Sequence, residues 1–302
     1  MKHTHTQMDA AKAGFFAGLI AYTIWGLFPI YFVAIAQVNT IEILAHRVVW
    51  SVPFGGLIIL ARRQTKDVAA ALRHRKTLLL LACAAIALSA NWGVYIWAIQ
   101  QGQIFQGSLG YYINPLIYVL VAVVFFGERL GRLQALAVLF AASGVIVLTV
   151  YGGVFPWISI FLAVSFTIYG VIRKQVEIGA MPGLFIETLV LLPVGLGYLV
   201  WLGQNGDMAF LSADLNLKAL ILLAGPLTVL PLLAFAFAAR RLKLSTLGFL
   251  QYIGPTLQFA CGVYYGEAFT PAHAICFGLI WLAVLLFSWD ALSKRRIARL
   301  AQ

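Results

Sequence analysis

Ten long apolar runs constrain the fold of this chain more than any other feature of its sequence. Each run has about the 20 residues that an α-helix needs to cross a bilayer. Only 10% of the 302 residues are charged and 62% are hydrophobic, whereas a soluble domain carries roughly 25% charged residues. We therefore predict an all-α polytopic membrane protein with no sizeable soluble domain. The predicted spans are 14–36, 41–61, 77–99, 105–126, 133–150, 156–172, 181–202, 218–239, 245–265 and 271–289.

The basic residues divide unequally between the two sides of these spans. Of the 21 Lys and Arg residues, 19 fall in the two termini and in alternate loops, Lys218 alone falls on the other side, and Arg47 lies within the second span. Cytoplasmic loops carry the excess of basic residues in membrane proteins. We therefore expect a multi-pass protein of the cell (inner) membrane with a cytoplasmic N-terminal segment, 1–13, and a basic cytoplasmic tail, 290–302. The charge of +11 then indicates contact with anionic lipid, not nucleic acid.

The second half of the sequence repeats the first. Tyr22 to Gly26 match Phe166 to Gly170, 144 residues later. Further pairs are Ile41-Glu42 with Ile186-Glu187, Leu109 to Pro115 with Leu247 to Pro255, and Gly127-Glu128 with Gly266-Glu267. Two repeats, 14–150 and 156–289, therefore contain five spans each. Because five is odd, the second repeat enters the membrane from the opposite side, and such inverted repeats are typical of alternating-access transporters.

These motifs also carry a resemblance to a known family. Trp25-Gly26, Arg47, the Gly-Glu-Arg-Leu of 127–130 and Gly266-Glu267 resemble the paired EamA domains of the drug/metabolite transporter superfamily. Glu42 to Arg47, Asn91-Trp92, Leu109 to Pro115, Ile186 to Thr188 and Leu247 to Pro255 are similar to its RarD subgroup of chloramphenicol-sensitive or chloramphenicol-resistance permeases. The resemblance implies two five-helix bundles around a central cavity, peripheral fifth and tenth helices, and export of a small molecule.

Two prolines mark corresponding helix breaks. Pro115 and Pro255 each fall near the middle of a span, where proline removes a backbone hydrogen bond. Interruptions at matching places in two repeats point to a transporter's central site or gate, although a simple kink that shapes the bundle explains them as well. Gly254 precedes Pro255. The polar or aromatic residues beside the two prolines are Tyr111, Tyr112, Asn114, Gln251 and Tyr252.

The third span carries a second polar group. Asn91 and Tyr95 share a helix face because they are four residues apart, and Trp92 lies beside them. An Asn in hydrocarbon must satisfy its donors and acceptors in another helix or in a wet cavity. We expect these residues, with Trp25 and Tyr169, to line a cavity for planar or amphipathic solutes, although aromatic residues in membrane helices also simply pack.

Five ionisable residues, Glu42, His46, Arg47, Glu187 and His273, lie inside spans, where charge is expensive and indicates function. Glu42 and His46 share a face in the second span, beside Arg47, and Glu187 lies in the seventh. We expect Arg47 to pair with Glu187, or locally with Glu42. The pair either holds the repeats together or has a carboxylate that takes a proton in each transport cycle.

The span ends have a structural interpretation. Gly127 and Gly266 are expected to adopt the left-handed conformation that ends a helix. Each is followed by a glutamate, Glu128 or Glu267, expected to face the amino end of the next helix. His273, near the outer end of the tenth span, is expected to be a satisfied interfacial histidine.

Together these features favour a secondary transporter, an exporter of small amphipathic or aromatic metabolites such as amino acids or drug-like compounds. No Walker motif is present, so ATP hydrolysis by this chain is not expected, and we predict no cofactor, no metal and no catalytic residue. Two alternatives remain: a membrane scaffold or lipid-binding subunit, and an intramembrane enzyme that uses Glu42 and His46 as an acid/base pair. Matching kinks in both halves are not required by an enzyme.

Overall fold

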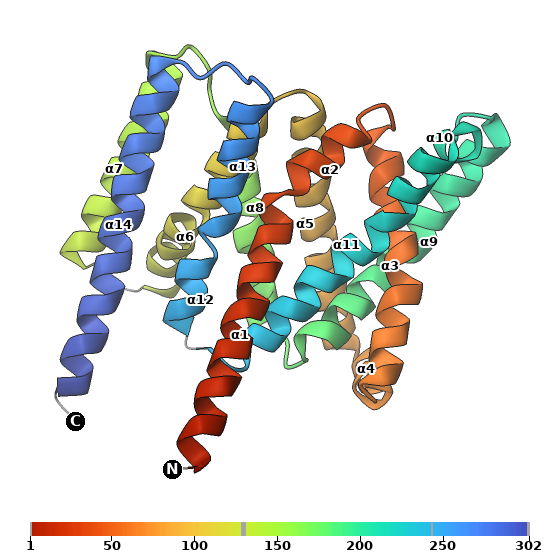
Figure 1. Ribbon diagram of the computed structural model, residues 1–302, viewed down its shortest axis with the longest axis horizontal. Coiled ribbons are helices and arrows are strands. Elements are labelled where there is room, and N and C mark those ends of the chain that lie inside the picture. The colour runs from red at the N-terminus through yellow and green to blue at the C-terminus, as the bar shows by residue number, and fades with distance from the viewer. Residues whose placement is uncertain (1, 128–130, 243, 301–302) are drawn as a thin grey trace.

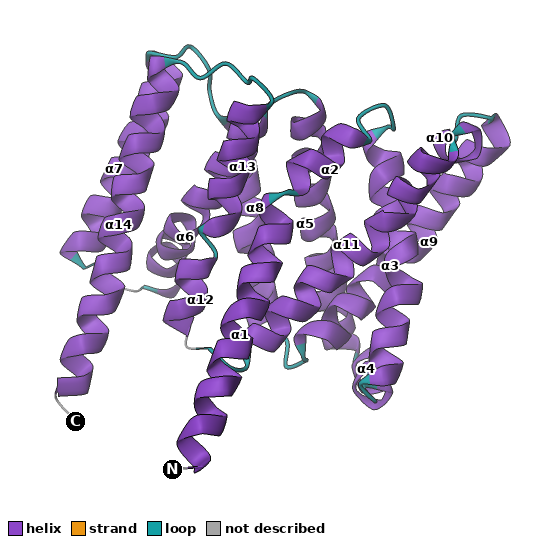
Figure 2. Cartoon of the chain, in the orientation of Figure 1, coloured by secondary structure: helices purple, strands orange, loops and turns teal. Residues whose placement is uncertain are grey.

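The computed structural model describes the backbone of residues 2–127, 131–242 and 244–300, and side chains except those of 2–10, 122, 125–126, 244–245 and 291–300. Every regular element in these ranges is an α-helix (Figures 1 and 2). The first half contains α1 (Lys2–Gly26), α2 (Phe28–Ala34), α3 (Thr40–Ala61), α4 (Thr65–Arg73), α5 (Arg75–Gln100), α6 (Ile104–Phe126) and α7 (Arg132–Val150). The second contains α8 (Trp157–Lys174), α9 (Ala180–Asn205), α10 (Ala209–Ser212), α11 (Leu215–Ala239), α12 (Leu244–Leu250), α13 (Ile253–Tyr264) and α14 (Pro271–Leu300).

The all-α membrane architecture is confirmed. Within the described residues, nine helical stretches are long and apolar enough to cross a bilayer. Each coincides with a predicted span to within a few residues. The remaining predicted span, 245–265, is formed by α12 and α13, and neither piece is long enough to cross alone. At the chain ends, α1 begins within the predicted polar segment and α14 continues into the basic tail.

The two halves run in opposite directions (Figure 1). α3 and α6 descend in the view, whereas α9 and the pair α12–α13 ascend. α7 and α14 pack against each other at one edge, with Ala137 and Ala141 of α7 and Cys276 and Ile280 of α14 in one buried cluster. These two helices are the fifth and tenth spans, so their peripheral position agrees with the resemblance. α1 begins and α14 ends on the face that also carries the α3–α5, α8–α9 and α11–α12 connections.

The first span is broken, although the sequence predicts it as one continuous helix. α1 ends at Gly26 and α2 begins at Phe28, with Pro29 in its first turn. A proline has no N–H and its ring clashes with the carbonyl four residues earlier, here that of Trp25. Gln258 of α13 donates its Nε2 to this carbonyl at 3.3 Å. A side chain from the second half therefore satisfies the backbone group that the break in the first half frees.

The helix continues through one of the two predicted prolines and is interrupted beside the other. α6 continues through Pro115, whereas the ninth span is interrupted between Leu250 and Ile253, just before Pro255. Asn114 donates its Nδ2 to the Ala163 carbonyl at 3.0 Å and to Thr167 Oγ1 at 3.1 Å, which ties α6 to α8 beside its proline. Gly254 has no side chain to make such bonds, and glycine weakens a helix.

Candidate functional site

Arg47 lies at the junction of the two halves. Its side chain comes from α3, is 3% exposed, and donates from Nε to Thr228 Oγ1 of α11 at 3.1 Å. The guanidinium carbon lies 4.2 Å from the ring centroid of Trp92 on α5 and 5.6 Å from those of Phe28 and Phe32 on α2. We call Arg47, Thr228, Trp92, Phe28 and Phe32 the arginine cluster. Cation–π contacts on several sides hold the guanidinium in place.

The predicted ion pairs of Arg47 are not formed. Within the described residues, neither Glu42 nor Glu187 lies within 4 Å of its guanidinium, and each carboxylate has another partner. The expectation that Arg47 pairs with Glu187 or Glu42 is therefore wrong. Depth along each span gave no information about how the helices are rotated, and α3 turns Arg47 toward the aromatic rings.

Asn91 joins three helices beside the arginine cluster. It is fully buried on α5 and donates its Nδ2 to the Leu162 carbonyl and to Ser165 Oγ of α8, both at 2.9 Å. Its Oδ1 accepts a bond of 3.2 Å from the Tyr111 hydroxyl of α6. The Tyr95 ring packs edge-on against Tyr111. Asn91 thus has protein partners for both ends of its amide, which gives it a structural part in the site.

Glu187 lies in a separate cluster near the start of α9. One of its oxygens is 3.4 Å from Nε of Arg173, the next-to-last residue of α8, and the other accepts from the Tyr169 hydroxyl at 3.4 Å. Gly183 makes room for this pair, since a Cβ added there would overlap the Arg173 guanidinium. The predicted residues Tyr169 and Glu187 are therefore in contact, and the cation that accompanies them is Arg173.

Glu42 occupies the repeat-equivalent position near the start of α3, on the opposite face. It is 2% exposed, and its oxygens accept from the backbone N–H groups of Ala209 and Phe210 of α10 at 3.2 and 3.1 Å. His46 Nε2 lies 3.6 Å away. Because His46 Nδ1 accepts from the Trp50 indole N–H, the proton of a neutral ring lies on Nε2, toward Glu42. Glu42 thereby fixes the α9–α11 connection.

The aromatic residues near the prolines form a third cluster between α6 and α13. The Tyr112 hydroxyl is 2.7 Å from Thr256 Oγ1, and its ring stacks on that of Tyr252. Ser108 of α6 donates to the Pro255 carbonyl at 2.8 Å. A cavity of about 270 Å³ lies beside this cluster. Its lining residues are Asn114, Pro115, Tyr118, Val119, Gln251 and Phe287.

Trp25 lies in none of these clusters; it is half-buried against Tyr22 and Phe235. The structure thus distributes the predicted cavity residues over several sites that contact one another through aromatic rings. Tyr111 packs on Phe166, and Phe166 packs on Tyr169. The central cavity that the family resemblance implies stays a prediction.

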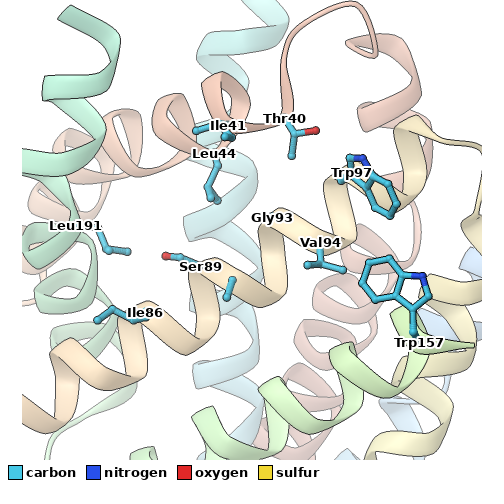
Figure 3. Close-up of a pocket in the computed structure, with 11 residues that line it drawn as sticks. Thr40, Ile41, Leu44, Ile86, Ser89, Gly93, Val94, Trp97, Trp157 and Leu191 are labelled. Carbon is cyan, nitrogen blue, oxygen red and sulfur yellow. The ribbon is translucent and has the colours of Figure 1, made fainter. Parts of the chain in front are cut away.

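A larger, apolar groove lies between α3, α5, α8 and α9, as Figure 3 shows. Its volume is about 570 Å³, and Trp97 and Trp157 lie side by side at one end. Ile41 and Ile86 in its wall are 57% and 64% exposed, so the groove opens on the outside of the bundle. It has no charged lining residue among those described, which sets it apart from the arginine cluster.

The predicted left-handed glycines are confirmed, with φ of +65° at Gly127 and +74° at Gly266. Glu128 lies outside the described residues. Glu267 does not face the next helix, so that expectation is wrong: its Oε2 accepts from the Phe105 N–H in the first turn of α6 at 2.8 Å. His273 is bonded, as predicted, with Nδ1 at 2.8 Å from Thr270 Oγ1.

The Glu267→Gln variant is expected to be more stable than the native protein at pH 8. Burial raises the pKa of Glu267 to about 7, although the backbone N–H groups of Phe105 and Ile104 partly oppose this rise. In the unfolded chain the pKa of this carboxyl is about 4.3, so the stability of the native protein falls between about pH 4.3 and 7 and is constant above pH 7.

The neutral amide of the Glu267→Gln variant avoids this loss of stability and still accepts from the Phe105 N–H. Thermal unfolding in detergent should show a Tm at least about 2 °C higher for the variant at pH 8 and little difference at pH 4.5. An equal difference at both pH values would contradict this.

The sequence did not predict several residues that contact the predicted site residues. Thr228, Phe28, Phe32 and Arg173 all touch a predicted residue. Pro29 was the signal for the break that brings α2 to Arg47. Arg173 was counted with the basic loops, but its position at the end of an apolar span could have indicated a partner for Glu187.

Comparisons with known proteins agree with this architecture. A model of the EamA-like transporter family matches residues 12–150. A Vibrio cholerae protein named "Uncharacterized transporter" is 47% identical, with 99% of each chain covered. The RarD proteins of Salmonella typhi and Escherichia coli are 42% and 40% identical, each covering 96% of this chain and 99% of its own length. A crystal structure only 19% identical shares the fold, with a TM-score of 0.59 over 95% of this chain and 99% of that one.

Proposed function

Because the chain belongs to the EamA-like transporter family, within its RarD subgroup, we propose that it is a secondary transporter that exports small amphipathic or aromatic metabolites by alternating access. One observation carries the proposal: the broken helices α1–α2 and α12–α13 belong to opposite halves and contact each other, with Gln258 bonded to the Trp25 carbonyl. Interrupted helices at the interface of two halves are where transporters bind their substrates. The basic face that carries both termini is then cytoplasmic.

Glu187 supports proton coupling. It is a carboxylate buried to 1% exposure within a membrane-spanning helix, and such groups serve proton relays in transporters. Its two partners, Arg173 and Tyr169, both lie on α8. Protonation of Glu187 would remove its attraction for Arg173 and let α8 and α9 separate on this face.

Flux in sealed proteoliposomes tests the proposal. The panel contains aromatic and aliphatic amino acids and chloramphenicol, with and without a pH gradient. We expect saturable flux of at least one solute, accelerated by the gradient, and a loss of about fivefold or more of this acceleration in Glu187→Gln. Glu177→Gln is the matched control, because Glu177 is an exposed carboxylate in the same α8–α9 region.

Two outcomes would count against parts of the proposal. Saturable flux that ignores the gradient would remove proton coupling and leave Glu187 a structural role. Flux equal to that of protein-free liposomes for every solute would favour a scaffold over a transporter.

A further inference from the structure

Arg47 is a buried cation that forms no ion pair with any carboxylate among the described residues. An arginine stays charged in proteins, and a charge removed from water is costly unless it is paired. The Thr228 hydroxyl and three aromatic rings are neutral contacts. Together they leave the positive charge uncompensated at the junction of the two halves.

The protein's own carboxylates in this region are engaged elsewhere. Glu42 accepts from the backbone of α10, and Glu187 pairs with Arg173. Arg47 Nη1 is buried without a hydrogen-bond partner in the described part of the chain, and the same is true of the Tyr95 hydroxyl. Both side chains pack on the Phe32 ring, at 5.6 Å for the guanidinium carbon and 6.0 Å for the Tyr95 ring. Two unsatisfied donors thus lie around one aromatic residue, although nearly all buried polar groups in proteins are bonded.

We propose that Arg47 binds the anionic group of the transported substrate, and that this substrate is a small monocarboxylic acid with an aromatic body. The proposal rests on the transport function above. One guanidinium whose Nη1 has no hydrogen-bond partner suits a single carboxylate, while the cluster contains no second cation for a phosphate dianion. The rings of Trp92, Phe28 and Phe32 offer stacking surface beside the charge. Tyr95 supplies a second donor.

Matched ligand pairs test this inference without relying on one variant. The probes are phenylalanine with phenylalaninamide, and indole-3-acetate with indole-3-acetamide, each pair differing in the carboxylate. Their inhibition of solute flux in proteoliposomes and their binding to the purified protein give two readouts. We expect each acid to bind at least tenfold more tightly than its amide, a difference of about 1.4 kcal/mol.

Substitutions then assign the preference to Arg47. Arg47→Met is expected to reduce the affinity for the acids at least tenfold, to that of the amides, and to leave the amides unchanged. Arg132→Met removes the same formal charge from the exposed start of α7 and should keep the native preference. Arg47→Lys keeps the charge but loses the planar fork, so it should retain a reduced preference. If Arg47→Met does not fold, the native acid-to-amide ratio and Arg47→Lys still decide.

Equal affinity for acid and amide in the native protein would overturn the inference, and so would a preference that survives in Arg47→Met. Either result with saturable flux of neutral solutes would leave the transport function intact. Absence of both flux and binding for every probe would remove the transport function and the inference together.

Discussion

Replacing Gly225 with leucine is expected to separate α11 from α3 and to destabilise the protein by about 3 kcal/mol or more. Gly225 lies where the two helices approach closely: a Cβ added there would lie 2.5 Å from the Trp50 carbonyl oxygen and 2.8 Å from its Cβ. The obstruction is the backbone of α3, which cannot move aside as a side-chain tip can. The contact also places Thr228, one turn further along α11, against Arg47.

The measurement is thermal unfolding of the purified protein in detergent, with Gly197→Leu as the control. Gly197 lies in α9 and is exposed, and a Cβ added there would meet no described atom of another helix within 4 Å. We expect Gly197→Leu to unfold at the native temperature or slightly above it, because leucine favours a helix more than glycine does. Equal unfolding temperatures for the two variants would mean that α3 and α11 do not meet at Gly225.

The sequence was sufficient to predict where most of the membrane-spanning helices lie along the chain. Apolar length depends on each segment alone, so nine of the ten predicted spans coincide with described helices that are long enough to cross a bilayer. The repeat correspondence likewise placed Glu42 and Glu187 at equivalent positions. Nothing in either signal specifies how a helix is rotated about its axis.

The rotation of each helix about its axis decides which side chains meet, and the predicted ion pairs of Arg47 were wrong for this reason. Arg47 and Glu42 are five residues apart on one helix, and α3 directs Glu42 to α10 and Arg47 to α2, α5 and α11. A helix turns by about 100° per residue, so five residues carry the two side chains to different faces. The partner of Glu187 is Arg173 at the end of α8, and the sequence alone does not show that its side chain turns toward α9.

Glu42 and Glu187, which occupy equivalent positions in the two repeats, each bind a neighbouring helix on opposite faces of the protein. Glu42 holds α10 at one face, and Glu187 holds the end of α8 at the other. Inverted repeats supply such pairs because the same local motif is used twice in opposite orientations. A substitution at one glutamate should therefore loosen one face and leave the other unchanged.

Glu42→Ala is accordingly expected to free α10 while the rest of the helical bundle keeps its structure. Two backbone donors, Ala209 and Phe210, would lose their acceptor, and a hydrogen bond to a charged group contributes about 1.5–3 kcal/mol. Hydrogen exchange at these amides should accelerate about tenfold or more. Glu42→Gln keeps one acceptor oxygen and should give a smaller increase, whereas Glu187→Gln should leave α10 at its native exchange rate. Unchanged exchange at Ala209 and Phe210 in Glu42→Ala would show that α10 is held by its apolar contacts instead, and acceleration in Glu187→Gln would show that the two faces are coupled.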